Sequence, residues 1–192
     1  MSITISTIRS RVLTKLAAEL SSPSYEDIHQ NSIDTWADEA AAMVIHNLPE
    51  EHLSRLKVVD QVVNLSSGSG SITSYNVERP IAVKVGSSKI NTNMYLDPAD
   101  FNRWDSSNFI LTPTTRAPVS LVANGNIYVK PTSYSIAYFD YFRQQPGLAS
   151  NSTYFSSAGD TMLVNIVASM AFGYLEEYDL EKAYLIKAGV AK

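Results

Sequence analysis

The sequence has no cysteine, only three histidines and no long hydrophobic run. Without cysteine there are no disulfide bonds, thiolate zinc sites or cysteine nucleophiles. No stretch approaches the roughly 20 consecutive apolar residues that a membrane-spanning helix needs. A Ser-His-Asp triad would have to use His29, His46 or His52, and no Gly-x-Ser-x-Gly motif accompanies them. We therefore expect no membrane segment and no catalytic residue, cofactor site or metal site of these kinds.

Two of the histidines, His46 and His52, flank Asn-Leu-Pro-Glu-Glu and superficially suggest a metal cluster. Two ligands on one helical face need a spacing of four residues, and Pro49 interrupts the helix between these two. Pro49 is instead well placed as the first residue of a short helix. A helix boundary explains these residues better than a metal site.

Charge is modest and unevenly distributed. The net charge of −4 disfavours a general nucleic-acid-binding surface. Residues 1–60 carry −4, residues 61–150 carry +2 and residues 151–192 carry −2. Two acidic ends around a slightly basic middle suggest that the ends fold together.

Both ends have the apolar periodicity of helices. Residues 4–20 and 32–47 each place apolar side chains on one helical face, and Ser24 begins a further helical stretch between them. After residue 160 the same periodicity returns, and Asp179 is placed to cap a last helix.

The middle of the chain has the composition of strands and turns. Asn124-Gly125 between two apolar runs predicts a two-residue hairpin turn, because both residues tolerate positive φ. With the strand that follows, it predicts an antiparallel meander over 118–142. The Ser-Gly run at 66–71 is a flexible loop by composition. Further strands are expected after Lys57, at 80–86 and at 89–98.

These patterns predict an α+β fold in which terminal α-helices pack as a bundle and carry an inserted antiparallel β module. We expect residues 1–56 and 157–192 to form the bundle and residues 57–156 to form the β module.

One strand is apolar on both of its faces. In the segment IAYFDYFR, Tyr138 and Phe142 point one way while Phe139 and Tyr141 point the other. One face must cover the core of the β module. The second face is covered either by the terminal helices or by a neighbouring subunit, because Tyr and Phe are enriched at interfaces. These four residues are the candidate subunit interface.

A cluster of acids surrounds Trp104, namely Asp97, Asp100 and Asp105. An aromatic ring flanked by carboxylates suits sugar stacking, and a pair of acids suits a glycoside hydrolase. Turn and helix-cap chemistry explains the same residues. A carbohydrate- or protein-binding module with this loop as its site is the alternative function, and an enzyme with a carboxylate pair is a third.

Three quoted stretches carry a resemblance to a known family. They are WADEA…IHNLP…LSRL (Trp36 to Leu56), NIYVKP…YFDYFRQQP (Asn126 to Pro146) and DTMLVNIVA…YLEEYDLEKA (Asp160 to Ala183). In their order the chain resembles the head-to-tail adaptor proteins of short-tailed bacteriophages, including ring proteins of the crAss-like phages. Residues 127–131 fit the family's hydrophobic-Tyr-hydrophobic-x-Pro strand. Residues 141–146 fit its Tyr-x-x-x-Pro strand end only with one extra residue.

The resemblance implies a structural, non-enzymatic virion protein of the head-tail connector, assembled in the host cytoplasm. Such adaptors form a homo-oligomeric ring, usually twelvefold, between the portal and other tail or ring proteins. DNA passes through the ring during genome ejection without sequence-specific binding. By its location, the C-terminal segment from Tyr184 through Lys187 to Lys192 is the candidate portal contact. We expect its removal to leave the fold intact.

Overall fold

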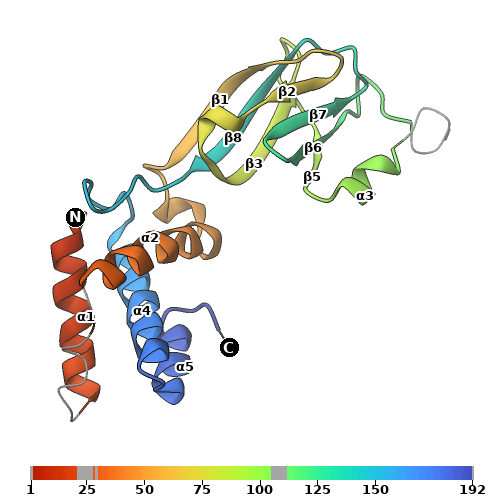
Figure 1. Ribbon diagram of the computed structural model, residues 1–192. Helices are drawn as coiled ribbons and strands as arrows, with labels where there is room; N and C mark the ends of the chain where they lie inside the picture. Colours follow the sequence, from red (N-terminus) through yellow and green to blue (C-terminus); the bar gives the residue numbers. More distant parts are fainter. Residues whose placement is uncertain (1, 21–27, 29, 105–111, 192) are drawn as a thin grey trace. The chain divides into compact units, whose positions relative to one another are not determined.

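The computed structural model of the chain is drawn in Figure 1 and describes residues 2–20, 28, 30–104 and 112–191. The chain divides into two compact units. Residues 1–56 and 144–192 form one, which we call the helical unit, and residues 57–143 form the other, which we call the β module. The fold is α+β, as predicted. The helical stretch expected from Ser24 begins outside the described residues.

The helical unit is built from both ends of the chain. Its elements, in chain order, are α1 (Ile5–Glu19), α2 (Gln30–Asn47), the 3-10 turn η2 (Glu50–His52), α4 (Ser157–Tyr174) and α5 (Tyr178–Lys187). Helix α4 packs against α1, α2 and α5 (Figure 1). Most of its side chains are buried, so it is the central helix of the unit.

Local sequence explains where these helices begin. Thr4 precedes α1 and its hydroxyl accepts a hydrogen bond from the Thr7 amide. Ser156 precedes α4 and accepts one from the Gly159 amide. Both are N-caps, which satisfy amides that have no partner inside the helix. Asp179, which we expected to cap α5, lies within its first turn, and the helix begins at Tyr178 without a side-chain cap.

Backbone and side-chain bonds join the two ends of the chain within this unit. The Ile3 amide donates to Thr153 Oγ1 at 3.0 Å, and the Thr153 amide donates to the Ile3 carbonyl at 2.9 Å. The Leu148 amide donates to Asp38 Oδ1 on α2 at 2.9 Å. Residues 144–156 therefore belong with the helices, and the second boundary lies at 143/144 instead of the expected 156/157.

In its described residues, 57–104 and 112–143, the β module contains eight strands and two short helical elements. They are β1 (Lys57–Asn64), β2 (Ser69–Ser71), η3 (Thr73–Tyr75), β3 (Val77–Val85), β4 (Ile90–Asn91), β5 (Asn93–Tyr95), α3 (Pro98–Asn102), β6 (Val119–Ala123), β7 (Asn126–Lys130) and β8 (Ile136–Arg143).

The strands form two four-stranded sheets, in the orders β1-β8-β3-β4 and β2-β7-β6-β5. All pairs are antiparallel except β5 with β6. Apolar side chains from β1, β3, β7 and β8 form a single core cluster, so the sheets share one core. Phe101 of α3 packs with Val119 and Leu121 of β6 in a second cluster.

The expected meander is right for its hairpin and wrong for its third strand. Asn124 and Gly125 have φ of 51° and 71° and join β6 to β7, as the turn motif predicts. Strand β8 leaves that sheet and pairs with β1 and β3 in the other. Pairing with strands distant in sequence overrides the order along the chain.

The Ser-Gly run expected as a flexible loop forms a tight turn followed by the short strand β2. Gly68 has φ of +79° in the turn between Ser66 and Ser69, and β2 follows, paired with β7. A Cβ on Gly70 would lie 2.6 Å from the Asn64 carbonyl oxygen and 2.6 Å from Val63 Cγ1. Glycine is needed here because the backbone runs directly against β1.

Among the described residues, no helix combines the length and apolar character needed to span a membrane.

Candidate functional site

The aromatic residues of β8 lie mostly inside the protein. Phe139 and Tyr141 belong to the shared core of the β module, where their rings stack with centroids 5.0 Å apart. Tyr141 also stacks on Tyr75 at 6.2 Å. Burial raises the pKa of the Tyr141 hydroxyl above its ordinary value. These residues serve the core and present no surface to a neighbouring subunit.

The opposite face of β8 is covered by cationic side chains. Phe142 is fully buried, with the Arg79 guanidinium 4.6 Å from its ring centroid. Tyr138 is half-buried, with Lys89 Nζ 4.7 Å from its ring. Of the four candidate interface residues, burial thus removes Phe139, Tyr141 and Phe142, and only Tyr138 keeps partial exposure.

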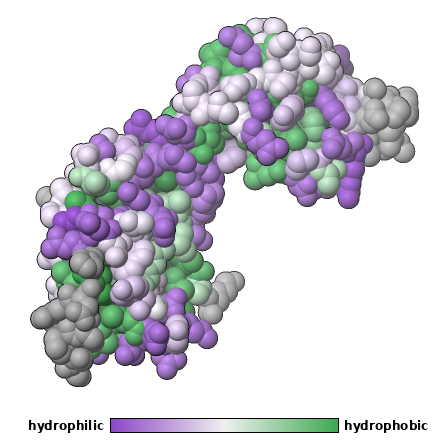
Figure 2. Space-filling model, in the orientation of Figure 1, coloured by the Kyte–Doolittle hydropathy of each residue, from purple (hydrophilic) through white to green (hydrophobic). Residues whose placement is uncertain are grey.

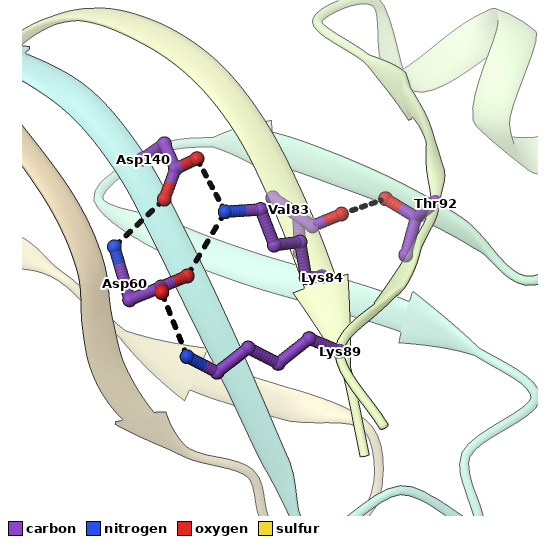
Figure 3. Close-up of polar contacts among 6 residues, drawn as sticks. All are labelled: Asp60, Val83, Lys84, Lys89, Thr92 and Asp140. Atoms are coloured by element: carbon purple, nitrogen blue, oxygen red, sulfur yellow. Dashed lines mark hydrogen bonds and ion pairs between the residues drawn. The ribbon is translucent and has the colours of Figure 1, made fainter. Parts of the chain in front are cut away.

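An ion cluster lies beside these rings and joins three strands (Figure 3). Lys84 Nζ on β3 lies 2.6 Å from Asp140 Oδ2 on β8 and 2.9 Å from Asp60 Oδ1 on β1. Lys89 Nζ completes the cluster, 2.7 Å from Asp60 Oδ2. Asp60 sits at a register shift in β1 with φ of 55°, and its amide donates to Asp140 Oδ1 at 2.7 Å.

The ion cluster is self-satisfied, which indicates a structural role. The hydrogen bonds from Lys89 and then Lys84 lower the pKa of the Asp60 carboxyl. Hydrogen bonds to Asp140 and then Asp60 raise the pKa of Lys84. Both groups are therefore held in their charged forms, and the cluster fixes the bulge of β1 against β8.

The candidate portal-contact residues differ in exposure. Tyr184 is buried on α5, 5.1 Å from the Phe172 ring, and its hydroxyl donates to Glu19 on α1 at 3.1 Å. Lys187 is exposed, with Nζ 4.0 Å from the Tyr184 ring and 3.6 Å from Glu19 Oε1. Lys192 lies outside the described residues. Tyr184 therefore joins α5 to α1 and α4 and is not a surface contact.

The residues around Trp104 perform turn and packing roles. Asp97 caps α3 by accepting from the Ala99 amide at 2.8 Å, and Asp100 pairs with Arg103 at 3.5 Å. The Trp104 indole donates to the Tyr95 hydroxyl at 3.0 Å and packs on the α3 cluster. Asp105 lies outside the described residues. In the described residues of this loop, the two acids thus serve as a helix cap and as an ion-pair partner.

Neither His46 nor His52 joins a metal cluster in the part of the chain that the structure describes. His52 Nδ1 lies 3.1 Å from Ser156 Oγ, and His52 Nε2 lies 3.6 Å from Glu51. His52 thus joins η2 to the residue that caps α4.

Large apolar side chains are exposed on both units, and Figure 2 shows apolar residues at the surface of each. On the helical unit they include Tyr174 at the end of α4, 63% exposed, and Tyr178 at the start of α5, 66% exposed. On the β module they include Val59 and Val62 of the edge strand β1. Sequence reasoning missed these residues because Tyr174 fits the apolar face of α4 and the β1 valines fit any half-buried strand.

No protein-family model matches this chain, and a search of curated proteins finds no match either.

Proposed function

We propose that this protein is a structural virion subunit: a head-to-tail adaptor that assembles as a ring between the portal and the tail of a short-tailed phage. The observation that carries the proposal is the division of the chain. Both termini build one helical unit, and a two-sheet β module is inserted between them. This is the order of elements that the quoted sequence stretches imply for such adaptors.

The exposed apolar residues support assembly with other protein. A closed ring needs heterologous contacts, in which two different surfaces of each subunit bind its two neighbours. Tyr174 and Tyr178 on the helical unit and the β1 valines on the β module supply such surfaces on separate elements. Exposed aromatic residues are typical of interface cores.

The charge of the helical unit fits a channel through which DNA passes. It carries seven Lys and Arg against thirteen Asp and Glu, a formal charge of −6. Where such a surface lines the ring, it repels the phosphate backbone and keeps DNA from adhering.

The direct test is negative-stain electron microscopy of this protein mixed with the portal protein of the same phage. We expect portal particles to gain an additional ring of density. Portal particles that remain bare at saturating protein would overturn the proposal. The variant Tyr174→Ala/Tyr178→Ala, checked for its helical circular dichroism, is the control for docking through the helical unit.

A further inference from the structure

A basic pocket opens between α1 and α4 of the helical unit. Its volume is about 340 Å³, and its lining residues are Arg11, Thr14, Lys15, Thr161 and Val164. This volume lies at the low end of ligand sites and suits one or two protein side chains. Arg11 and Lys15 are one helical turn apart on α1, so they stand on the same face.

The two cations of this pocket, Arg11 and Lys15, have no ion-pair partner among the described residues. Lys15 Nζ lies 5.3 Å from the Tyr184 ring, and Arg11 acts on the buried Asp160 only through its field. They are two of only seven cations in a unit of net charge −6. Such a basic patch on an acidic body selects an anionic partner.

The same unit presents an acidic and aromatic turn where α4 meets α5. Glu176, Glu177 and Asp179 are exposed there, close in sequence to the exposed Tyr174 and Tyr178. Within the described residues none of these three acids forms an ion pair. We call residues 174–179 the acidic turn. Its charge and its aromatic rings complement the basic pocket.

Within one copy no ion pair joins the acidic turn to the basic pocket in the described part of the chain. Thr161 of the pocket lies in the first turns of α4 and Tyr174 of the acidic turn is its last residue, about 20 Å away at 1.5 Å per residue. The part of the pocket around Arg11 and Thr161 can therefore meet the acids of this turn only between copies. The contact that they form is heterologous, as a ring requires.

We propose that the acidic turn of one copy binds in the basic pocket of the next, so that this contact links neighbouring subunits of the ring. The Tyr178 ring enters the pocket over Val164, and Glu177 and Asp179 pair with Arg11 and Lys15. The inference rests on the proposed function, because a ring contains many identical contacts whose binding free energies add up. Exposed ion pairs are individually weak, so each contact is transient outside the ring.

Cysteine cross-linking tests the contact directly, because the natural chain has no cysteine. The variant Thr14→Cys/Lys182→Cys places one thiol on the pocket and one on the exposed face of α5, one turn beyond Tyr178. With a short bismaleimide we expect a ladder of covalent dimers, trimers and larger oligomers on a denaturing gel. Each single-cysteine variant should give no ladder.

The matched control is Thr14→Cys/Asn47→Cys, which keeps the pocket thiol and moves the other to the exposed end of α2. That end is remote from Trp36, the α2 residue whose ring lies 5.7 Å from Tyr174. An equal ladder from this control, or no ladder from the test variant, would overturn the inference.

Charge reversal provides a second measurement that does not depend on thiols. By sedimentation velocity, Arg11→Glu/Lys15→Glu should weaken self-association about tenfold or more, and so should Glu177→Lys/Asp179→Lys. Mixing the two variants should restore association between them, since each then carries a surface complementary to the other. If both variants self-associate as strongly as the wild type, the proposed contact is contradicted.

The two proposals fail separately. Rings on the portal without a cross-linked ladder would mean that the subunits meet elsewhere, and the adaptor function would stand. A ladder together with bare portal particles would retain the contact and remove the adaptor function.

Discussion

Lys84 Nζ on β3 lies 2.6 Å from Asp140 Oδ2 on the neighbouring strand β8. The two side chains are 20% and 10% exposed, so the pair is largely withdrawn from water. Removing the cation would leave Asp140 buried without a counterion, which is costly in free energy. The pair therefore links β8 to β3, and the stability of the sheet depends on this link.

We expect Lys84→Met to lower the free energy of unfolding by roughly 2–3 kcal/mol, below the figure for fully buried pairs because some water reaches Lys84. Urea denaturation followed by circular dichroism measures the change. Lys89→Met is the control: Lys89 is 44% exposed, and its loss should cost less than about 1 kcal/mol. Equal effects of the two variants would contradict a special role for Lys84.

The same cluster sets a pH dependence at both extremes. Because the pKa of Lys84 is raised, its ion pairs contribute their full stability below the ordinary lysine pKa of about 10.4. This stability is lost as pH rises through the raised pKa. The lowered pKa of Asp60 gives stability that is complete above about 3.9 and is lost as pH falls through the lowered value. The alkaline loss should be smaller in Lys84→Met than in the wild type.

Gly70 offers a test of the close approach between β2 and β1. Gly70→Ala should destabilise the protein by roughly 1–3 kcal/mol, since its Cβ would overlap the Asn64 carbonyl oxygen and Val63. Gly147→Ala is the matched control, because no atom lies within 4 Å of its added Cβ. That change should stay within about 0.5 kcal/mol. A wild-type melting temperature for Gly70→Ala would show that the strands separate at little cost.

Local patterns in the sequence predicted the elements well. The stripe of Ile8, Val12 and Leu16 is the buried face of α1, and the Asn124-Gly125 turn forms as its chemistry requires. These signals work because helices and tight turns are determined by residues close together in the chain.

Features made by residues distant in sequence were not predictable. The Ser-Gly run becomes a strand because β7 pairs with it, and nothing within the run itself indicates a strand. The ion cluster needs Asp60, Lys84 and Asp140 from three strands, whose adjacency depends on the sheet order. Likewise, Tyr184 is buried because α5 packs against α4 and α1, a contact that periodicity cannot specify.

The isolated protein should be monomeric or weakly associated in solution. Contacts between exposed surfaces are individually weak, and they add up only when a portal holds many copies in a ring. Multi-angle light scattering over a range of concentrations measures this. A stable ring without portal would contradict a templated assembly.

Asp160 should be destabilising at neutral pH. It is buried in the first turn of α4, and its Oδ1 finds no hydrogen-bond partner in the described part of the chain. Burial raises the pKa of this carboxyl, against smaller lowering effects from Thr153 and Arg11. The folded protein thus gains stability from this group as pH falls and loses it as pH rises through the raised pKa.

Asp160→Asn should therefore stabilise the protein at pH 7 by about 1 kcal/mol, after the loss of a favourable helix-dipole interaction is subtracted. The difference from wild type should shrink as pH approaches 4. Asp179→Asn, an exposed position in the first turn of α5, is the control and should not stabilise. If Asp160→Asn is less stable than the wild type at pH 7, the favourable interactions of the buried carboxylate fully offset the cost of burying it.

Tyr184 should be essential to the fold, which reverses our expectation that residues 184–192 can be removed without harm. Its ring fills space against Phe172, so Tyr184→Ala should cost about 3–5 kcal/mol, as large-to-small changes of buried aromatics do. Tyr184→Phe keeps the ring and loses only the hydrogen bond to Glu19, about 1 kcal/mol.

Removal of residues 184–192 should accordingly reduce the helical circular dichroism and the melting temperature. Lys187→Ala separates folding from docking, because its side chain is 53% exposed and its ion pair with Glu19 is long, 3.6 Å. That variant should lose less than about 1 kcal/mol of stability, the effect of one exposed ion pair. Its melting temperature should therefore stay close to that of the wild type. If it also loses portal binding in the microscopy assay, Lys187 contacts the portal. If the truncated protein melts like the wild type, α5 is a docked appendage and Tyr184 is not part of the core.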